Sequence, residues 1–407
     1  MISRIILLLA VLSTAPTPAL GQEPDTREEA LRREREAKSK QLKAPESSRL
    51  ERVLFALEDG RAFERLLNPA EGIYPKIGTV TPGSGFSFGP GYRRPGLFNN
   101  RADFSAFAAG SFKKYWLLDA RLLFPRLAGG AAFAEIHGQR YDFPQEDFFG
   151  LGPDSRREDH VVFGIQNSVV GTTGGVRLAP WLSVGGRIYY LMPRVGGTRD
   201  SGLPSIETRF AASQVPGLAQ QPDVVRYEVF ADVNYRQPLG NPRRGGRYYA
   251  GYQQFDDRGM NRYAFRRVEA DLQHYISLLE DRRVLAFRAL ASLSDTDDGR
   301  EVPFYLQRTL GGPDDLRGFR RYRFRDRNLL LLQAEYRWEI FTAMDGAIFY
   351  DAGKVASRAA DLDLRDLESD YGIGVRFGTV NGVFLRIEGA FGSRDGKHFV
   401  FRFGNVF

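Results

Sequence analysis

The sequence predicts an all-β fold, a transmembrane antiparallel barrel of about 16 strands that follows a short helical periplasmic segment. Two observations support this prediction. From residue 72 onward, polar and apolar residues alternate with a period of two, as in strands with one polar and one apolar face. Short and long connections also alternate along the chain, which is typical of outer-membrane barrels. Beyond the N-terminus, no apolar run approaches the ~20 residues of a membrane helix, so a helical membrane protein is excluded.

The amino-acid composition excludes several classes of protein and of functional site. The 407 residues include 57 Lys and Arg against 50 Asp and Glu, 31 Phe, 18 Tyr and no Cys. Without cysteine there is no disulfide scaffold, cysteine zinc site, iron–sulfur cluster or cysteine nucleophile. The many Phe and Tyr residues are those that an interfacial aromatic girdle needs.

The first 21 residues have the pattern of a secretory signal peptide. Arg4 precedes an uncharged apolar stretch at 5–12, and Ala19-Leu20-Gly21 forms a small-x-small cleavage site. The stretch is too short for a membrane anchor, which is the alternative. We therefore expect export, cleavage before Gln22, and a place in the bacterial outer membrane.

Residues 22–71 are expected to form a charged helical periplasmic segment. They contain 11 basic and 12 acidic residues. Ser48 and Glu51 have capping-box spacing, and the apolar residues at 50–57 recur on one helix face. Two interpretations stay open: a helix packed on the periplasmic rim or a tail, and a pore plug or partner-docking helix.

The period-two pattern is clear in two segments. In 332–340, Gln, Glu, Arg and Glu alternate with Leu, Ala, Tyr, Trp and Ile, and 225–236 repeats the pattern with Phe230 as the exception. A soluble sandwich also alternates in this way. It does not explain the regular order of short and long connections.

Counting the connections predicts the barrel at 72–407. The long connections all follow odd-numbered strands, so they lie at one end: 142–157, 194–222, 296–327 and 354–369. The tight ones, at 179–180, 341–343 and 379–381, lie at the other end. The segment 296–327 is then the sixth external loop. Closure into a barrel follows because an open sheet edge in lipid leaves N–H and C=O groups unsatisfied.

Five pieces near the carboxyl end stand in a fixed order. They are Leu310-Gly311-Gly312 with Leu316-Arg317-Gly318-Phe319, Glu335-Tyr336-Arg337, Phe349-Tyr350-Asp351-Ala352-Gly353, Gly372-Ile373-Gly374-Val375-Arg376, and the closing Phe399-x-Phe401-x-Phe403-Gly404-Asn405-Val406-Phe407. This set resembles the bacterial surface antigen superfamily, the BamA/TamA-type outer-membrane barrels. The resemblance is strong over 302–407 and weaker over 72–407.

The resemblance implies a sixth loop that folds back into the lumen of a sixteen-stranded barrel. Arg317 then pairs with Asp351, with Glu335 as a second candidate, and strand parity independently places Glu335 inward. Gly318 is expected to let the loop turn sharply, and Phe319 to pack against the wall. The alternative is that Arg317 is one of several ordinary loop arginines.

The final aromatic residues resemble the sorting signal by which outer-membrane barrels are recognised. Phe399, Phe401, Phe403 and Phe407 have outward spacing. The alternative is simply a lipid-facing strand, and both descriptions can hold together.

The function that the resemblance implies is insertion, assembly or translocation of proteins or lipids at the bacterial outer membrane. Its mechanism uses a weakly paired seam, here between the first strand near 74–79 and a last strand that contains Gly404. Family members typically carry POTRA modules before the barrel. The segment 22–71 is too short for one, so the chain resembles the barrel-only branch.

Two other function classes stay open. One is a passive channel gated by the tethered loop, and the other is a structural or adhesive surface protein that uses loop 194–222. The implied partners are outer-membrane lipid, unfolded barrel substrates and an accessory periplasmic protein.

No enzyme is expected, and no catalytic residue, metal or cofactor is predicted. Ser87 lies in a GxSxG match, but its neighbours alternate as in a strand instead of forming a strand–turn–helix elbow. The four histidines are scattered. Arginines alternate with acids on the strands, so the excess of seven positive charges does not indicate nucleic acid.

Overall fold

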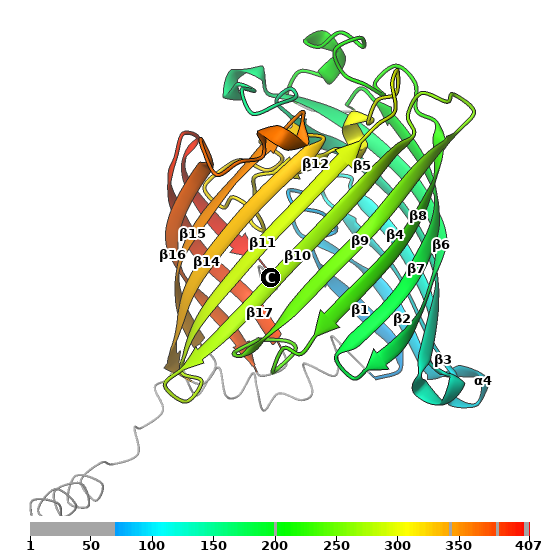
Figure 1. Ribbon diagram of the computed structural model, residues 1–407, viewed down its shortest axis with the longest axis vertical. Helices are drawn as coiled ribbons and strands as arrows, with labels where there is room; N and C mark the ends of the chain where they lie inside the picture. The colour runs from blue at the N-terminus through cyan, green and yellow to red at the C-terminus, as the bar shows by residue number, and fades with distance from the viewer. Residues whose placement is uncertain (1–69, 199–201, 342–343, 380–381, 403–406) are drawn as a thin grey trace, which may run out of the picture. The chain divides into compact units, whose positions relative to one another are not determined.

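The computed structural model describes residues 70–407 except 199–201, 342–343, 380–381 and 403–406. The predicted signal peptide and nearly all of the predicted helical segment lie outside the described residues. One antiparallel sheet of 16 strands, paired in chain order, curls into a barrel (Figure 1). This confirms the predicted fold class.

The strands of the barrel follow the predicted ranges closely. They are β1 (Gly72–Gly78), β2 (Ser87–Gly96), β3 (Ala102–Ser111), β4 (Trp116–Leu127), β5 (Ala132–Phe148), β6 (Val161–Ala179), β7 (Leu182–Gly196), β8 (Asp223–Asn234), β9 (Gly245–Arg258), β10 (Phe265–Leu278), β11 (Arg283–Asp295), β14 (Asn328–Phe341), β15 (Met344–Ala356), β16 (Glu368–Thr379), β17 (Gly382–Ser393) and β18 (Gly396–Arg402).

The described part of the chain contains little helix. The short elements are α4 (Leu97–Asn100), η1 (Ala128–Gly130), η2 (Arg157–Asp159), η3 (Ile206–Thr208), η4 (Phe304–Leu306) and η5 (Ala359–Asp361). Phe98 and Asn99 in α4 have positive φ, so α4 is a tight turn rather than a regular helix. None of the helices in the described residues is long and apolar enough to cross a bilayer.

The two ends of the barrel differ, and we call them the loop end and the turn end. The longest connections, after β5, β7, β11 and β15, lie at the loop end, and the connections at the turn end are short except for the one after β8 (Figure 1). Some boundaries differ from the prediction. β5 continues to Phe148, so the loop after it is shorter, and β2 runs over Ser87–Gly96 instead of 84–91. The expected end of the last strand at 406 lies outside the described residues.

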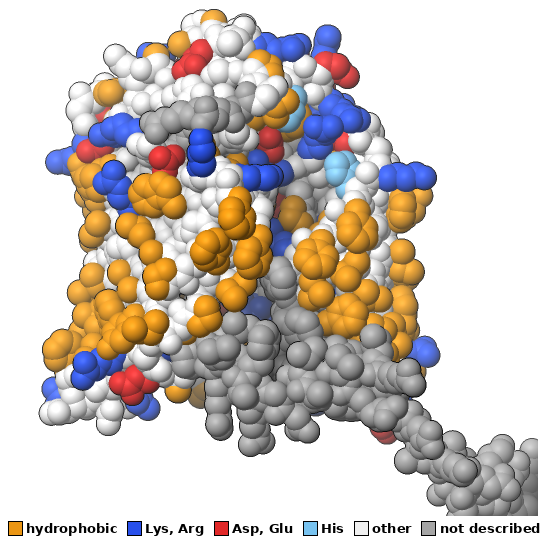
Figure 2. All heavy atoms as spheres, turned by 180° about the vertical axis from the view of Figure 1, so that it is seen from behind, with side chains coloured by type: hydrophobic (Ala, Val, Ile, Leu, Met, Phe, Trp, Pro, Cys, Tyr) orange, Lys and Arg blue, Asp and Glu red, His pale blue; other side chains and the backbone are white. Residues whose placement is uncertain are grey.

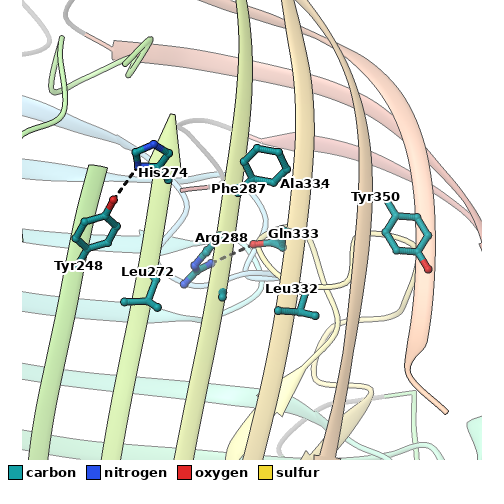
Figure 3. A pocket seen from close by; sticks show the side chains of 10 residues that line it. Tyr248, Leu272, His274, Phe287, Arg288, Leu332, Gln333, Ala334 and Tyr350 are labelled. Atoms are coloured by element: carbon teal, nitrogen blue, oxygen red, sulfur yellow. Dashed lines mark hydrogen bonds between the residues drawn. The ribbon is translucent and has the colours of Figure 1, made fainter. Parts of the chain in front are cut away.

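Side chains alternate between the two faces of the wall as predicted. On the outer face, Leu272, Phe287 and Tyr350 are about half exposed. On the inner face, Arg288 pairs with Asp271 and donates to the Gln333 side chain (Figure 3). Figure 2 shows the outer hydrophobic side chains gathered in a band that charged side chains border at both ends. This is the distribution that a bilayer-spanning barrel requires.

Candidate functional site: the docked sixth loop and the seam

The connection 296–327 between β11 and β14 folds as an ordered hairpin. It contains η4 and the short strands β12 (Arg308–Leu310) and β13 (Phe324–Asp326), which pair with each other. Gly311 and Gly312, directly after β12, both have φ near +110°, a conformation that favours glycine. These glycines let the chain leave β12, and residues 313–323 then form the tip of the loop.

Arg317 lies at this tip and is 1% exposed. Its Nε and Nη2 donate to the two carboxylate oxygens of Asp351 at 2.6 and 2.7 Å, which is a bidentate pair. Its Nη1 donates to Glu335 at 2.7 Å and to Glu388 at 3.3 Å. The guanidinium also lies 3.4 Å from the centre of the Phe349 ring. Three carboxylates and one aromatic face therefore surround a single loop arginine.

The carboxylates around Arg317 are shared with arginines of the wall. Arg337 Nε donates to Glu335 at 2.8 Å, Arg386 donates to Glu388 at 3.0 Å, and Arg376 contacts both acids. We call this set the arginine–carboxylate network, and each member is at most 2% exposed: Arg317, Glu335, Arg337, Asp351, Arg376, Arg386 and Glu388. Buried charges of this kind are stable only when each is paired and hydrogen-bonded.

Three glycines of the wall motifs lie where neighbouring groups come very close to the backbone. A Cβ on Gly372 would lie 2.2 Å from the Phe349 ring, and one on Gly374 would lie 2.5 Å from Glu388 Cγ. A Cβ on Gly353 would lie 2.7 Å from a backbone oxygen of β14. Close approach of neighbouring groups therefore explains why these positions are glycine.

Gly318 has a different role from the one expected. Its φ lies outside the left-handed region, so it does not supply a sharp turn. A Cβ at this position would instead lie 2.5 Å from Asp370 Cβ. Asp370 is directly across from Asp351 in the pairing of β15 with β16. The glycine lets the loop backbone lie against the wall beside this second buried acid.

Phe319 packs into an apolar cluster between the loop and the inner wall. Its ring is 2% exposed and lies 5.3 Å from that of Phe324, centre to centre. The other members are Leu290, Leu310, Leu316, Leu329, Leu331 and Val355. Apolar packing therefore holds the loop beside the arginine–carboxylate network.

Two loop residues have pKa values that follow from their surroundings. Burial lowers the pKa of the Arg317 guanidinium, but the charges of Asp351 and Glu335 outweigh this effect and raise the pKa well above its ordinary value. Burial raises the pKa of the Asp315 carboxyl from 3.8 to about 7, although the Arg288 charge opposes the rise. Arg317 is therefore a permanent cation, and Asp315 titrates near neutral pH.

β1 and β18 are the two edges of the sheet, and we call the line between them the seam. In the described residues, β1 pairs only with β2, and β18 pairs only with β17. A hollow of about 380 Å³ lies beside β18, and its lining includes His160, Arg317, Arg320, His398 and Phe401. Figure 2 shows the wall hollowed on this side, with charged side chains visible inside.

The sixth loop contacts both flanks of the seam. Toward the last strands, Arg323 pairs with Asp395 at 3.1 Å. Toward the first strands, the hydroxyls of Tyr322 and Thr81 lie 3.4 Å apart, and Arg321 pairs with Asp147 at 2.9 Å. The loop therefore bridges the seam at the loop end.

The final aromatic residues do not share one face. Phe399 and Phe401 are 74% and 59% exposed on the outer wall. Phe407 is 8% exposed, and its ring lies 6.1 Å from the Tyr275 ring and 5.4 Å from the Arg337 guanidinium. The outward placement expected for Phe407 is therefore wrong, because its ring packs against inward-facing residues of β10, β11 and β14. Phe403 and Gly404 are outside the described residues.

Sequence reasoning singled out Arg317, Glu335 and Asp351, and the structure brings them together. It did not select Glu388, Arg386 or Asp370, although their alternation on β16 and β17 indicates inward positions. Arg337 and Arg376 belonged to the motif pieces but had no assigned role. Barrel curvature and loop conformation decide which inward residues contact a given loop side chain. Period-two alternation in the sequence carries no information on either.

Comparison with known proteins finds one family model that matches part of the chain. Residues 214–407 match the Omp85 superfamily domain. No curated protein matches the chain at a significant level.

The fold resembles solved structures at low sequence identity. BamA from Haemophilus ducreyi lacking POTRA domains 1-3 matches with a TM-score of 0.60 and 16% identity, over 82% of this chain and 69% of that one. CdiB from Acinetobacter baumannii matches with a TM-score of 0.51 and 13% identity, over 81% and 58%. CdiB from Escherichia coli matches with a TM-score of 0.50 and 13% identity, over 81% and 61%. The chain thus spans less than two thirds of both CdiB chains.

The domain match lies over the strands and the loop that build the network, and the barrel as a whole has the fold of BamA. Over residues 214–407, the chain therefore resembles the Omp85 superfamily domain.

Proposed function

We propose that this chain, exported by residues 1–21, acts at the bacterial outer membrane in the insertion, assembly or translocation of proteins or lipids. The seam is its working edge, and the sixth loop, tethered by Arg317, is the support for that edge. The observation that carries the proposal is the combination of two edge strands with no mutual pairing in the described residues and a buried loop that contacts both flanks.

The physical reason lies in the backbone of the edges. In hydrocarbon, unpaired N–H and C=O groups each cost several kcal/mol, on the order of 2–7. An open seam therefore favours pairing with another extended segment, as exposed edges do. β1 has only seven residues, so any ladder of hydrogen bonds between β1 and β18 is short.

The loop tether keeps the two flanks within reach of each other. Because Arg317 contacts acids on β14, β15 and β17, it fixes the loop tip to the wall on the β18 side of the seam. Arg321 and Tyr322 then hold the other flank. Unfolded barrel proteins and lipid are the partners that fit this arrangement, with an accessory periplasmic protein as a further partner.

The test measures how fast a small unfolded barrel protein inserts into liposomes that contain this protein. Wild type is compared with Arg317→Ala and with Arg358→Ala, which removes an exposed arginine that pairs with Asp361. We expect faster insertion with wild type and Arg358→Ala, but not with Arg317→Ala. A heat-dependent gel shift checks that each barrel is folded.

Two results would contradict the proposal. If wild type gives no acceleration over empty liposomes, the insertion role is wrong. If Arg317→Ala instead raises ion conductance and leaves insertion unchanged, the loop gates a passive channel.

A further inference from the structure

One connection at the turn end of the barrel is longer than its neighbours. The chain between β8 and β9, residues 235–244, forms a ten-residue turn. The turn has its own hydrogen bonds: Gln237 N donates to Arg244 O, and Arg243 N donates to Gln237 O, both at 2.9 Å. Asn241 is only 7% exposed although it lies in a turn. The turn is therefore an ordered element that packs against other parts of the barrel.

The contacts of Arg243 show which part of the barrel the turn packs against. Its Nη2 donates to both carboxylate oxygens of Asp345, at 2.9 and 2.8 Å. Asp345 is near the start of β15 and is 4% exposed. In the sheet order, β15 is four strands from β9, which is about 19 Å along the wall at ~4.8 Å per strand. An arginine side chain cannot span that distance from a turn that stays above its own strands.

The contact is made inside the barrel. Asp345 is directly across from Arg376, which belongs to the buried arginine–carboxylate network and therefore faces the lumen. Asp345 shares that face. At the base of the turn, Arg236 donates to the inward Gln273 side chain at 3.1 Å. Residues 235–244 thus lean across the mouth of the lumen.

The far end of the turn reaches the structure that holds the sixth loop. Arg376 contacts Glu335 and Glu388, and both acids accept hydrogen bonds from Arg317. Asp345, which Arg243 contacts, is therefore opposite a residue of this network in the β15–β16 pairing.

We propose that residues 235–244 are a strap that closes the turn end of the lumen, and that the Arg243–Asp345 pair is the catch that holds it. Releasing the catch opens the lumen to ions from that end. The strap is independent of the role proposed for the seam, because neither Arg243 nor Asp345 contacts β1 or β18 in the described contacts.

The experiment measures ion conductance in planar bilayers. Arg243→Gln and Asp345→Asn each remove one side of the catch, and R243D/D345R exchanges the two charges. Arg282→Gln is the matched control, because Arg282 is an exposed arginine on another turn at the same end. We expect several-fold higher conductance from each single variant, a return toward wild type in the exchange, and no change in the control.

Equal conductance of wild type, Arg243→Gln and Asp345→Asn would overturn the proposal. If these variants fail the gel-shift test for folding, proximity is measured instead. The chain has no native cysteine, so R243C/D345C treated with a short bis-maleimide reports only this contact. Cross-linking supports the strap, and its absence with both thiols reactive overturns it.

Discussion

Arg317 shows how one side chain fixes a loop inside a barrel. Its five N–H groups find three carboxylates, and its flat face covers the Phe349 ring. Lysine cannot reproduce this geometry, because an ammonium has neither the planar fork nor the stacking face. Removing one member of such a buried set leaves the others unpaired, which costs about 3–5 kcal/mol.

Gly318 tests how closely the loop backbone approaches the wall. Gly318→Ala adds a Cβ only 2.5 Å from Asp370 Cβ, so the loop tip must move, at a cost of about 1–3 kcal/mol. Gly138→Ala is the control, because a Cβ there meets nothing within 4 Å. We expect urea unfolding in detergent micelles to show a loss only for Gly318→Ala. Equal midpoints for the two variants would show that the loop does not depend on this contact.

Asp315 makes the stability of the docked loop depend on pH. Burial raises its pKa from 3.8 to about 7, so the folded state holds a proton that the unfolded state releases. The stabilisation from this proton is fully present below pH 3.8 and is lost as pH rises through about 7. Asp315→Asn stays neutral throughout.

The measurement for Asp315 is the unfolding midpoint of wild type and Asp315→Asn between pH 4 and 8. We expect the advantage of the variant over wild type to grow as pH rises. Two curves that stay parallel over this range would contradict the shifted pKa.

At the scale of elements, the sixth loop is held inside the barrel by apolar and charged contacts, and it also spans the seam. Its apolar cluster with Leu290 and Leu331 and its buried network fix it to one side of the barrel. Arg321 and Arg323 add contacts on opposite flanks of the seam. The loop is therefore anchored at three places that are far apart in the sequence.

R321Q/R323Q should free the outer part of the loop while Arg317 keeps the tip docked. We expect limited proteolysis to cut the freed outer part of the loop severalfold faster than in wild type. R358Q/R365Q is the control, since both arginines are exposed and pair with acids of the β15–β16 connection at the same end. Unchanged cleavage in R321Q/R323Q would mean that the network alone holds the loop.

At the scale of the whole molecule, the proposed activity depends on the seam between β1 and β18. The other neighbouring strands are joined by antiparallel ladders, whereas β1 and β18 have no mutual pairing in the described residues. The adjacent hollow lies against the sixth loop. The seam is the place where the wall can change with the least loss of hydrogen bonds.

Locking the seam should abolish the proposed activity. Because the chain has no cysteine, pairs placed one in 72–78 and one in 396–402 can be oxidised without side reactions. We expect insertion to stop on oxidation and to return on reduction. Y92C/A106C is the control, since it joins directly opposed residues of β2 and β3. Insertion by a fully cross-linked seam would contradict the proposal.

The alternation in the sequence was enough to predict the strands and the two ends of the barrel. A period of two places Glu335 and Arg337 inward and Tyr336 outward, and the order of long connections assigns 296–327 to the loop end. Local pattern determines these features because pleating alone decides which face a side chain takes.

Only the tertiary structure decided which distant residues meet. The meeting of Glu388 with Arg317, the reach of Arg243 to Asp345 and the inward position of Phe407 all depend on how the sheet curls and how chain segments enter the lumen. Alternation gives the face of a strand residue but not its depth or its neighbours across the barrel. In a barrel, those neighbours come from curvature and from loops that fold inward, and neither leaves a periodic mark in the sequence.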